Sequence, residues 1–349
     1  MKILLYTDNH FCTNSSIINS RGENYSTRLT NQIESLNWVE QLAIKENCNI
    51  EICLGDFFNN PTLTAEELSA LREINWNHLE KEFIVGNHEM GNNDLSYNSL
   101  NALSNIGNIV TKPTLIADDY CNIILIPYIL ESNRKSLKEY INEAFENTQE
   151  NYNAELPLVI LTHNDIKGIQ YGGFLSKAGF DIEEINGLNG IFIDGHLHNK
   201  ETYGLVIPKV FILGNLTGLN FGENAFEYSH NAYILDTENL QLKTVENPYA
   251  FKFFKFDILL EEDLEKYKNF FQPNSVVSIK VLQSLSEKVK EFVYSNKNII
   301  KSRITIIPEI SNTQDNTVII SKDHIQQFKE YILENVGCDD IIQEELGRL

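Results

Sequence analysis

Residues 190–200 read GIFIDGHLHNK, a short apolar run followed directly by two histidines one residue apart. Alternate residues of a strand point to the same side, so His196 and His198 can reach a common object. The chain has only eight histidines among 349 residues, which makes this pair at the end of an expected strand a candidate for metal binding. The other ligands of such a metal must then come from elsewhere in the chain.

The same pattern recurs through the first two hundred residues, where apolar runs end in side chains that can bind metals. These side chains are Asp8 and His10 in TDNH, Asp56 in GDFF, Asn87 and His88 in GNHE, and His163 in THND. Strand ends at one edge of an open sheet converge, so ligands far apart in sequence can meet in one crevice. Each motif alone occurs by chance, but five in this order, each after an apolar run, together predict a metal centre.

The predicted ligands are carboxylates, imidazoles and an amide, with no thiolate among them. This set suits Mn²⁺, Fe²⁺ or Zn²⁺ in a catalytic site better than a structural zinc site. Seven ligands are too many for one tetrahedral ion, but fit two ions about 3.5–4 Å apart that share a carboxylate, an arrangement that supports displacement at phosphorus. The chain has a net charge of −21 and no evident basic patch, so a phosphate must be attracted locally by the ions.

The order of apolar runs and helical periodicities predicts a layered α/β fold. A helix is expected over residues 31–47, and the capping box Thr64–Glu67 predicts another that extends to about residue 81. From about residue 251 the pattern reads β, α, β, α, β without metal-binding side chains. We therefore expect a large domain over residues 1–250, a small α+β domain over 251–315 and a helical segment over 316–349.

Composition also limits the environment of the protein. The five cysteines form no CxxC pair and leave one unpaired, which argues against a disulfide framework or a zinc ribbon. No stretch approaches the roughly 18 apolar residues of a membrane span. The N-terminal apolar run turns polar at Thr7, too early for a secretory signal. We expect a cytoplasmic protein with no membrane partner.

The complete series Asp-x-His, Gly-Asp, Gly-Asn-His-Glu, His and Gly-His-x-His resembles the calcineurin-like metallophosphoesterases. Within this superfamily the chain is most similar to SbcD-type nuclease subunits of DNA repair and their shorter phage recombination relatives. Three further stretches carry that similarity: GDFFNNP at 55–61, THNDIKGIQYGG at 162–173 and FILGNLTGLNFGE at 211–223. The resemblance covers roughly residues 1–250. Two positions depart from it: Glu89 stands where the nucleases usually have Asp, and Asn59 where some relatives have a histidine.

The resemblance implies a sandwich of two mixed sheets flanked by helices, and it implies how two divalent ions are held. One ion would be bound by Asp8, His10, Asp56 and His198, and the other by Asp56, Asn87, His163 and His196, with Asp56 as the bridge. Mn²⁺ is the first choice, with Fe²⁺, Zn²⁺ or Mg²⁺ as alternatives. The ions would activate water, and His88 would protonate the leaving oxygen or stabilise its charge. Alternatively, His88 only orients Asn87.

The resemblance also implies a function and partners. We expect a two-metal DNA phosphodiesterase, an exonuclease or endonuclease that works with an SbcC-like coiled-coil ATPase in recombination and repair. The alternatives are a phosphatase or small-molecule phosphodiesterase, and a metal-binding scaffold that regulates an ATPase. The helix after Pro61 would form a homodimer contact or simply pack in the core, and a helix near 325–336 would dock on the ATPase or on the small domain. His78, His230 and His324 match no motif and are interpreted as surface or core histidines.

Overall fold

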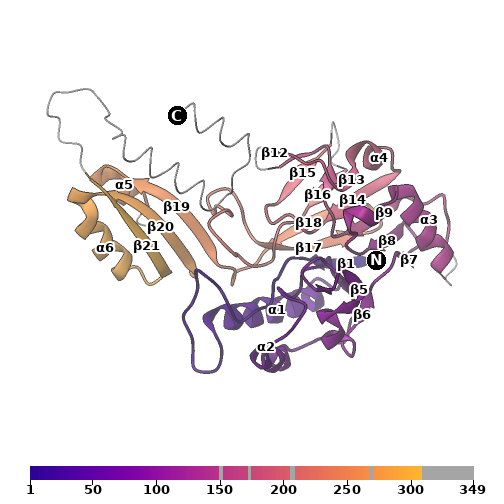
Figure 1. Cartoon of the computed structure of the whole chain (residues 1–349), viewed down its shortest axis with the longest axis horizontal. Helices are drawn as coiled ribbons and strands as arrows, with labels where there is room; N and C mark the ends of the chain where they lie inside the picture. The colour runs from indigo at the N-terminus through magenta and orange to yellow at the C-terminus, as the bar shows by residue number, and fades with distance from the viewer. Residues whose placement is uncertain (149–151, 172–173, 205–208, 268–269, 309–349) are drawn as a thin grey trace, which may run out of the picture. The chain divides into compact units, whose positions relative to one another are not determined.

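The computed structural model describes residues 1–148, 152–171, 174–204, 209–267 and 270–308 (Figure 1). The predicted helical segment 316–349, with its docking helix near 325–336, lies outside these residues. Two six-stranded sheets dominate the described chain. Among the described residues, no helix is both long enough and apolar enough to cross a membrane.

The first sheet has the strand order β18-β17-β1-β2-β3-β6. Its strands are β1 (Lys2–Tyr6), β2 (Ile50–Cys53), β3 (Glu80–Ile84), β6 (Asn108–Val110), β17 (Asn231–Asp236) and β18 (Gln241–Glu246). The strands β1, β2, β3 and β6 run parallel, whereas β17 pairs antiparallel with both β1 and β18. The sheet is therefore mixed.

The second sheet has the order β15-β16-β14-β9-β8-β7 and is also mixed. Its strands are β7 (Thr114–Ala117), β8 (Asn122–Ile126), β9 (Leu158–Thr162), β14 (Gly190–Asp194), β15 (Glu201–Tyr203) and β16 (Val210–Ile212). The edge strands β7 and β15 are antiparallel to their neighbours. Side chains from both sheets, such as Ile52 of the first and Ile193 of the second, form one buried cluster. The predicted sandwich of two mixed sheets is confirmed.

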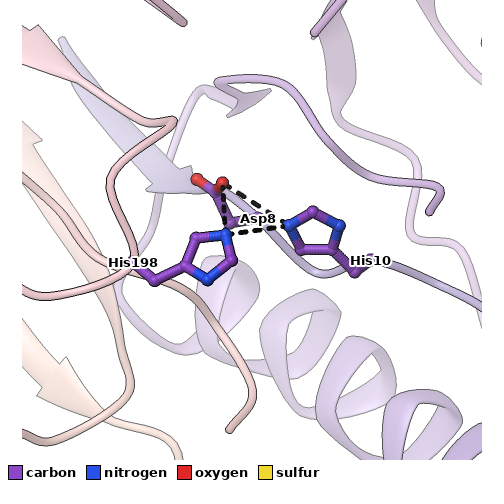
Figure 2. Close-up of side chains that lie close together, drawn as sticks. All are labelled: Asp8, His10 and His198. Carbon is purple, nitrogen blue, oxygen red and sulfur yellow. Dashed lines mark hydrogen bonds and ion pairs between the residues drawn. The ribbon is translucent and has the colours of Figure 1, made fainter. Parts of the chain in front are cut away.

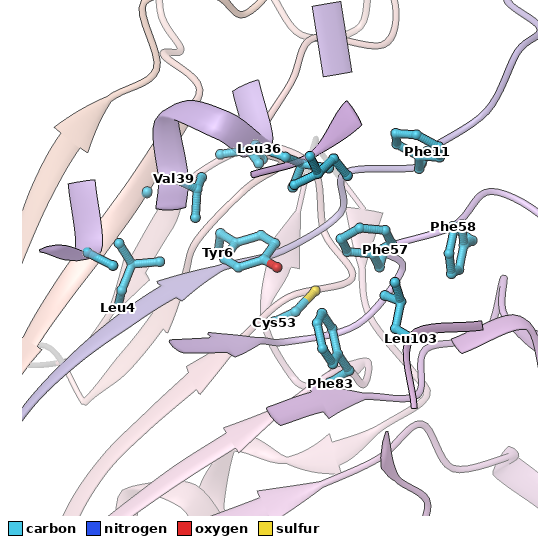
Figure 3. Close-up of a cluster of buried hydrophobic side chains, with 14 of the residues drawn as sticks. Leu4, Tyr6, Phe11, Leu36, Val39, Cys53, Phe57, Phe58, Phe83 and Leu103 are labelled. Atoms are coloured by element: carbon cyan, nitrogen blue, oxygen red, sulfur yellow. The ribbon is translucent and has the colours of Figure 1, made fainter. Parts of the chain in front are cut away.

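Helices cover the outer faces of the sandwich. On the first sheet, α1 (Thr27–Lys45) packs Leu36 and Val39 onto Leu4 and Tyr6 (Figure 3). On the second sheet, α3 (Leu137–Asn147) and α4 (Ile182–Asn186) cover an apolar cluster of their own. Both α1 and α3 begin at serine caps, and α3 carries a capping box.

The helix expected from Thr64 to about residue 81 is much shorter than predicted. The capping box of Thr64 and Glu67 is present, but α2 (Ala65–Ala70) ends after six residues and continues as the single 3₁₀ turn η1 (Leu71–Glu73). The backbone N–H groups of Asn75 and Asn77 then donate to side chains of α1, at 2.7 and 2.8 Å. These side-chain acceptors replace helical hydrogen bonds, so the chain follows α1 instead of continuing the helix.

The expected dimer contact on this helix is only partly exposed. Leu71 and Ile74 belong to the main apolar core, with 8% and 5% of their surfaces accessible, whereas Leu68 is 45% exposed. Core packing therefore accounts for two of the three residues. A homodimer contact remains a prediction that concerns Leu68.

Short strand pairs and turns lie outside the large sheets. The strands β4 (Met90–Gly91) and β5 (Asp94–Asn98) form one hairpin, and β11 (Gln170–Tyr171) and β12 (Phe174–Leu175) form another. The strand β10 (Ile166–Lys167) pairs in parallel with β13 (Phe180–Asp181). The remaining 3₁₀ turns are η2 (Ser99–Leu103), η3 (Glu131–Asn133) and η4 (Gln283–Leu285).

The chain after residue 251 has the predicted β, α, β, α, β order. Its elements are β19 (Lys252–Ile258), α5 (Glu261–Tyr267), β20 (Ser275–Leu282), α6 (Ser286–Ser295) and β21 (Ile299–Ile307). The three strands form a parallel sheet in sequence order, and both helices pack on the same apolar cluster. We call β19–β21 with α5 and α6 the small sheet domain. Its boundaries at 251 and 315 remain predictions.

A candidate metal centre at the strand ends

The predicted ligands all follow the carboxyl ends of strands in the two large sheets. Asp8 and His10 follow β1, Asp56 follows β2, and Asn87 and His88 follow β3. His163 follows β9, and His196 and His198 follow β14. The strands β1, β2 and β3 are neighbours, as are β9 and β14, so the topology gathers these residues at one edge of the sandwich.

Asp8, His10 and His198 form the first cluster (Figure 2). The Oδ1 atom of Asp8 lies 3.7 Å from Nε2 of His10 and 3.6 Å from Nε2 of His198. The two Nε2 atoms are 3.1 Å apart. Three potential ligand atoms therefore point to one place, although they come from segments nearly 190 residues apart.

Asp56, His163 and His196 form the second cluster. Oδ2 of Asp56 lies 3.1 Å from Nε2 of His163. Asn87 joins this group, because its Oδ1 lies 3.1 Å from Nδ1 of His196. The structure thus brings together the four residues predicted for the second ion.

Asp56 connects the two clusters. The same Oδ2 atom that faces His163 lies 3.8 Å from Nε2 of His10 in the first cluster. Asp56 therefore has the central position that a bridging carboxylate requires. The structure brings all seven predicted ligands together, and their binding of metal remains a prediction.

His88 stands at the open side of this arrangement. Its Nε2 is 4.0 Å from Oδ2 of Asp56, and 41% of its side chain is exposed. Its Nδ1 lies 3.0 Å from the backbone oxygen of Asn59, an arrangement that favours a proton on Nδ1 and directs Nε2 towards the clusters. The side chain of Asn59, at the position where some relatives have a histidine, places its Oδ1 3.1 Å from Nδ1 of His10. The asparagine can therefore orient His10.

The backbone under the clusters is unusual. Asp8, His10, Asp56 and His196 all have positive φ values, between 47° and 63°. Aspartate and histidine adopt this left-handed conformation more readily than most residues, but it still costs energy. A Cβ at Gly86 would lie 2.3 Å from Oδ1 of Asp56, so only glycine fits there. The ligand directions are thus fixed by the backbone.

Aromatic residues hold the loop that carries Asp56. Phe57 and Phe58 follow it directly and are fully buried, with Phe57 against Phe83 and Phe58 near Leu103 (Figure 3). The ring centroids of Phe57 and Phe58 are 4.8 Å apart. The bridging position is therefore anchored in the main core of the protein.

The charges of the clusters suit a cation. Burial opposes ionisation of Asp8, but the neighbouring histidines lower its pKa to about 2, and they also lower the pKa of Asp56. Burial would lower the pKa of His163, but Asp56 and Asp8 raise it to about 10. Among the described residues, Oδ1 of Asp8 and Nε2 of His163 are buried without a hydrogen bond. Buried carboxylates and imidazoles with free ligand atoms fit divalent metal ions.

Glu89, which departs from the nuclease pattern, is hydrogen-bonded to the backbone of the loops that carry Asp56 and Asn87. It is fully buried and accepts hydrogen bonds from the backbone N–H groups of Asp56, Phe58 and Gly86, at 3.1, 2.7 and 2.9 Å. Burial and the charge of Asp56 raise its pKa to about 8, whereas the donors at Phe58 and Gly86 act against this shift. Glutamate in place of aspartate therefore reaches both the second and the third strand ends.

Two carboxylates that the sequence interpretation did not select contact the paired histidines. Oδ1 of Asp165 lies 3.4 Å from Nε2 of His196, and Oε1 of Glu223 lies 3.5 Å from Nδ1 of His198. The contact with His196 lowers the pKa of Asp165. Such carboxylates commonly orient histidines that bind metals. Each histidine of the GHLH motif thus has its own acidic partner.

His230 lies on the other side of the contact between Glu223 and His198, because it also faces Glu223. It was interpreted as a surface or core histidine, and the structure buries it, with Nδ1 2.7 Å from Oδ1 of Asn215 and Nε2 3.9 Å from Glu223. Glu223 also accepts a hydrogen bond from the backbone of Leu219. Both acidic partners lie in stretches that carry the resemblance, Asp165 in THND and Glu223 at the end of FILGNLTGLNFGE. They were missed because roles were assigned only to the residues of the ligand series.

A fold of two mixed sheets with two linked carboxylate–histidine clusters at their edge defines a metal-dependent phosphoester hydrolase. A family model described as calcineurin-like phosphoesterase matches residues 1–200, and the chain belongs to this family. The family uses two divalent metal ions, and the two clusters are the candidate positions for them.

Solved structures are similar at low identity. TT1561 of Thermus thermophilus is 13% identical over 70% of this chain and 98% of that one, with a TM-score of 0.41. A dimetal phosphatase from Danio rerio is 10% identical over 70% and 98%, with a TM-score of 0.41. A putative 5′-nucleotidase from Staphylococcus aureus is 14% identical over 70% of this chain, which spans about half (52%) of it, with a TM-score of 0.44. No curated protein sequence matches the chain.

Proposed function

We propose that the protein is a two-metal-dependent DNA phosphodiesterase, the nuclease subunit of an SbcCD-like complex. The proposed hydrolysis of phosphodiesters rests on the pair of clusters linked by Asp56. Its Oδ2 lies 3.1 Å from Nε2 of His163 and 3.8 Å from Nε2 of His10. Bound ions would supply positive charge at phosphorus and activate water. The chain contributes the ligands, the rigid backbone that directs them, and His88 at the open side.

His88 has the geometry of a group that acts on the leaving oxygen. Its Nδ1 is held by the backbone oxygen of Asn59, and its exposed Nε2 faces the clusters. A substrate phosphate placed between the clusters and solvent would meet this nitrogen first. His88 can then donate a proton or a hydrogen bond to the oxygen that leaves.

A cationic face on the small sheet domain supports DNA as the substrate. In the strand register, Lys255 pairs with Ser278 and Ser278 with Arg303, so Lys255 and Arg303 share a face of the sheet. Lys280 lies two residues after Ser278 and Lys301 two residues before Arg303, so both are on this face as well. All four are exposed in the described part of the chain. The helices cover the opposite face, through Phe254 and Val277. We call Lys255, Lys280, Lys301 and Arg303 the cationic face.

The cationic face begins next to segments that lead to the metal centre. On the same side of the sheet, Phe253 and Val276 pack against Ile18, which lies eight residues after His10. The ammonium group of Lys301 donates to Oδ1 of Asn19 at 3.0 Å. A polyanion that followed this face would therefore reach the region of the first ligand loop. No basic patch was evident in the sequence, because the four cations come from three strands.

The charges also favour this substrate over a small one. A net charge of −21 repels nucleic acid in general, so a local group of four cations beside one acid, Asp257, is informative. A phosphatase or small-molecule phosphodiesterase with the same metal centre remains the second candidate. The partly exposed carboxylate of Asp165 beside His196 favours it, since this acid would repel a polyanion.

DNA cleavage with Mn²⁺ tests the proposal. The wild type should cleave linear and hairpin DNA, and Asp56→Asn and His88→Ala should each lose most of this activity. Activity that survives both changes would exclude the mechanism. Bis(4-nitrophenyl) phosphate, assayed in parallel, reports the metal centre without a polyanion.

Charge reversal on the cationic face tests the substrate separately. The double variant Lys255→Glu/Arg303→Glu should lose roughly tenfold or more in DNA cleavage and show a weaker salt dependence, because it removes phosphate contacts. Its turnover of the small diester should be unchanged. The matched control is Lys266→Glu/Lys290→Glu, on the helices that cover the opposite face. Equal losses in both double variants would show a general charge effect and favour the small-molecule alternative.

We also propose the partners that the resemblance implies, a coiled-coil ATPase and a second copy of the chain. Co-purification of the co-expressed proteins tests the first, and the molecular mass in solution tests the second. The scaffold alternative predicts that a purified pair binds metal and ATP but does not cleave DNA.

A further inference from the structure

A cavity of about 600 Å³ lies beside the metal centre, and the metal clusters do not account for it. It is formed by the β4–β5 hairpin, the segment 111–113 before β7, the loop after β8 and the start of α3. Its volume is in the range of pockets that enclose small organic ligands. Two of its lining residues place it near the metal centre. Met90 directly follows Glu89, which supports the ligand loops, and the ring centroid of Tyr128 is 5.9 Å from that of His196.

The backbone at Tyr128 is fastened to two ligand loops. Its N–H donates to the oxygen of Val85 at 2.8 Å, just before Gly86 and Asn87. The next N–H, of Ile129, donates to Oδ1 of Asn164 at 3.0 Å, and Asn164 directly follows His163. Tyr128 therefore has a fixed position between the cavity and the second cluster.

The lining suits a flat heterocycle better than a second phosphate. Pro113, Pro127 and the ring of Tyr128 offer flat apolar surfaces, and Asn92 and Asn133 offer amide donors and acceptors. Of its two lysines, Lys135 is paired with Glu143 at 3.3 Å. The other, Lys112, has no ion pair with the described residues, and one exposed ammonium is little for a phosphate group.

We infer that this cavity binds the base of the nucleotide next to the scissile phosphate, with Tyr128 stacking on the base. The inference rests on the proposed phosphodiesterase function and adds a base-binding site to it. Aromatic side chains stack on nucleic-acid bases without strong sequence preference. The position of Tyr128 within ring contact of His196 would place the base one step from a phosphate held at the clusters.

Two esters with the same leaving group test the inference. The first is thymidine 5′-(4-nitrophenyl phosphate), and the second is the same ester with hydrogen in place of the base. With Mn²⁺, the wild type should have a kcat/KM roughly tenfold higher for the ester that carries the base, a typical effect of base stacking. Tyr128→Ala should bring this ratio close to one. Asn133→Trp, which fills the cavity and leaves Tyr128 in place, should do the same.

The control variant is Tyr294→Ala, which removes a tyrosine that is 95% exposed on α6 and should keep the wild-type ratio. Melting temperatures identify a variant that fails to fold. If Tyr128→Ala does not fold, the ratio measured for Asn133→Trp decides the test. Wild-type cleavage of both esters at equal rates, or a ratio kept in the folded cavity variants, would overturn the base site and leave the phosphodiesterase standing. Cleavage of neither ester nor DNA would overturn the proposed function itself.

Discussion

Clusters of buried charged side chains lie at both ends of the strands β2 and β3, and they differ in the kind of base that faces the acids. At the amino end, Lys81 of β3 lies beside Glu51 of β2 and Glu40 of α1, with its Nζ 3.1 and 3.0 Å from their carboxylates. At the carboxyl end, the only basic side chains paired with the acids Asp8 and Asp56 among the described residues are imidazoles. The amino end therefore contains a permanent cation, and the described carboxyl end does not.

This difference separates a structural charge cluster from a binding site. Lys81 is 2% exposed and also donates to Oδ1 of Asn77, so the two acids have their counter-charge within the fold. In the metal centre, Oδ1 of Asp8 is buried without a hydrogen bond, and its nearest basic atoms are histidine nitrogens at 3.6 and 3.7 Å. An imidazole can lose its proton when a metal ion binds, whereas a lysine keeps its charge.

Removal of the internal cation should have the largest effect. Lys81→Met would leave Glu40 and Glu51 buried without a counter-charge, and should reduce the free energy of unfolding by about 3–5 kcal/mol. Urea denaturation measures this loss, with the exposed Lys290→Met as the control. Metal binding by the folded fraction should remain. A loss below about 1 kcal/mol would mean that the amino-end cluster is not structural.

Removal of the central acid at the carboxyl end should have its main effect on metal binding. Asp56→Asn should weaken Mn²⁺ binding, measured by calorimetric titration, by more than about a hundredfold, beyond the range seen for residues that only support ligands. The metal-free variant should also lose some stability, because the histidines lower the pKa of Asp56 and its charge therefore stabilises the folded state. Wild-type Mn²⁺ affinity in Asp56→Asn would contradict the comparison.

The acidic partners of the paired histidines should have an intermediate effect. Asp165→Asn and Glu223→Gln should each weaken metal affinity by about 10–100-fold, because they orient the histidines without binding the ions. Titration of the metal-free protein measures this directly. The buried Glu40→Gln, at the amino end of the strands, is the matched control. Unchanged affinity in both partner variants would remove their positioning role.

The smallest effect concerns pH at the amino end. Burial and the charge of Glu40 raise the pKa of Glu51 from 4.5 to about 7. The folded state then binds more protons than the unfolded state between these values, so the free energy of unfolding should fall as pH rises through this window. The slope contributed by one group is at most about 1.4 kcal/mol per pH unit.

Glu51→Gln tests this pH dependence, because glutamine cannot titrate. The variant should lack the contribution of this group to the slope between pH 4.5 and 7, measured by urea denaturation at several pH values. An unchanged slope would show that Glu51 does not carry it.

The sandwich and the convergence of the ligands were predictable, because both depend on patterns that are local in sequence. Each apolar strand ends in its own motif, and the rule that parallel strand ends share an edge then brings Asp8 to Asp56 in the first sheet and His163 to His196 in the second. The order of the small sheet domain was predictable for the same reason. Its strands and helices each have a distinct periodicity.

Features that depend on register or on distant partners were not predictable. The cationic face combines Lys255, Lys280 and Arg303, one from each of three strands, and only the register shows that they share a side. The early end of α2 depends on acceptors from α1 that the local sequence does not contain. Asp165 and Glu223 likewise become relevant only after the histidines are placed in space.

The left-handed backbone at four of the ligands has a consequence for protein engineering. Transfer of Asp8, His10, Asp56 and His196 to another α/β protein would copy the side chains without the conformations that direct them. The graft must also include Gly86, whose missing Cβ makes room for Asp56. The smallest transferable unit is therefore the set of strand-to-loop turns, and a design that copies only the ligands should bind metal weakly.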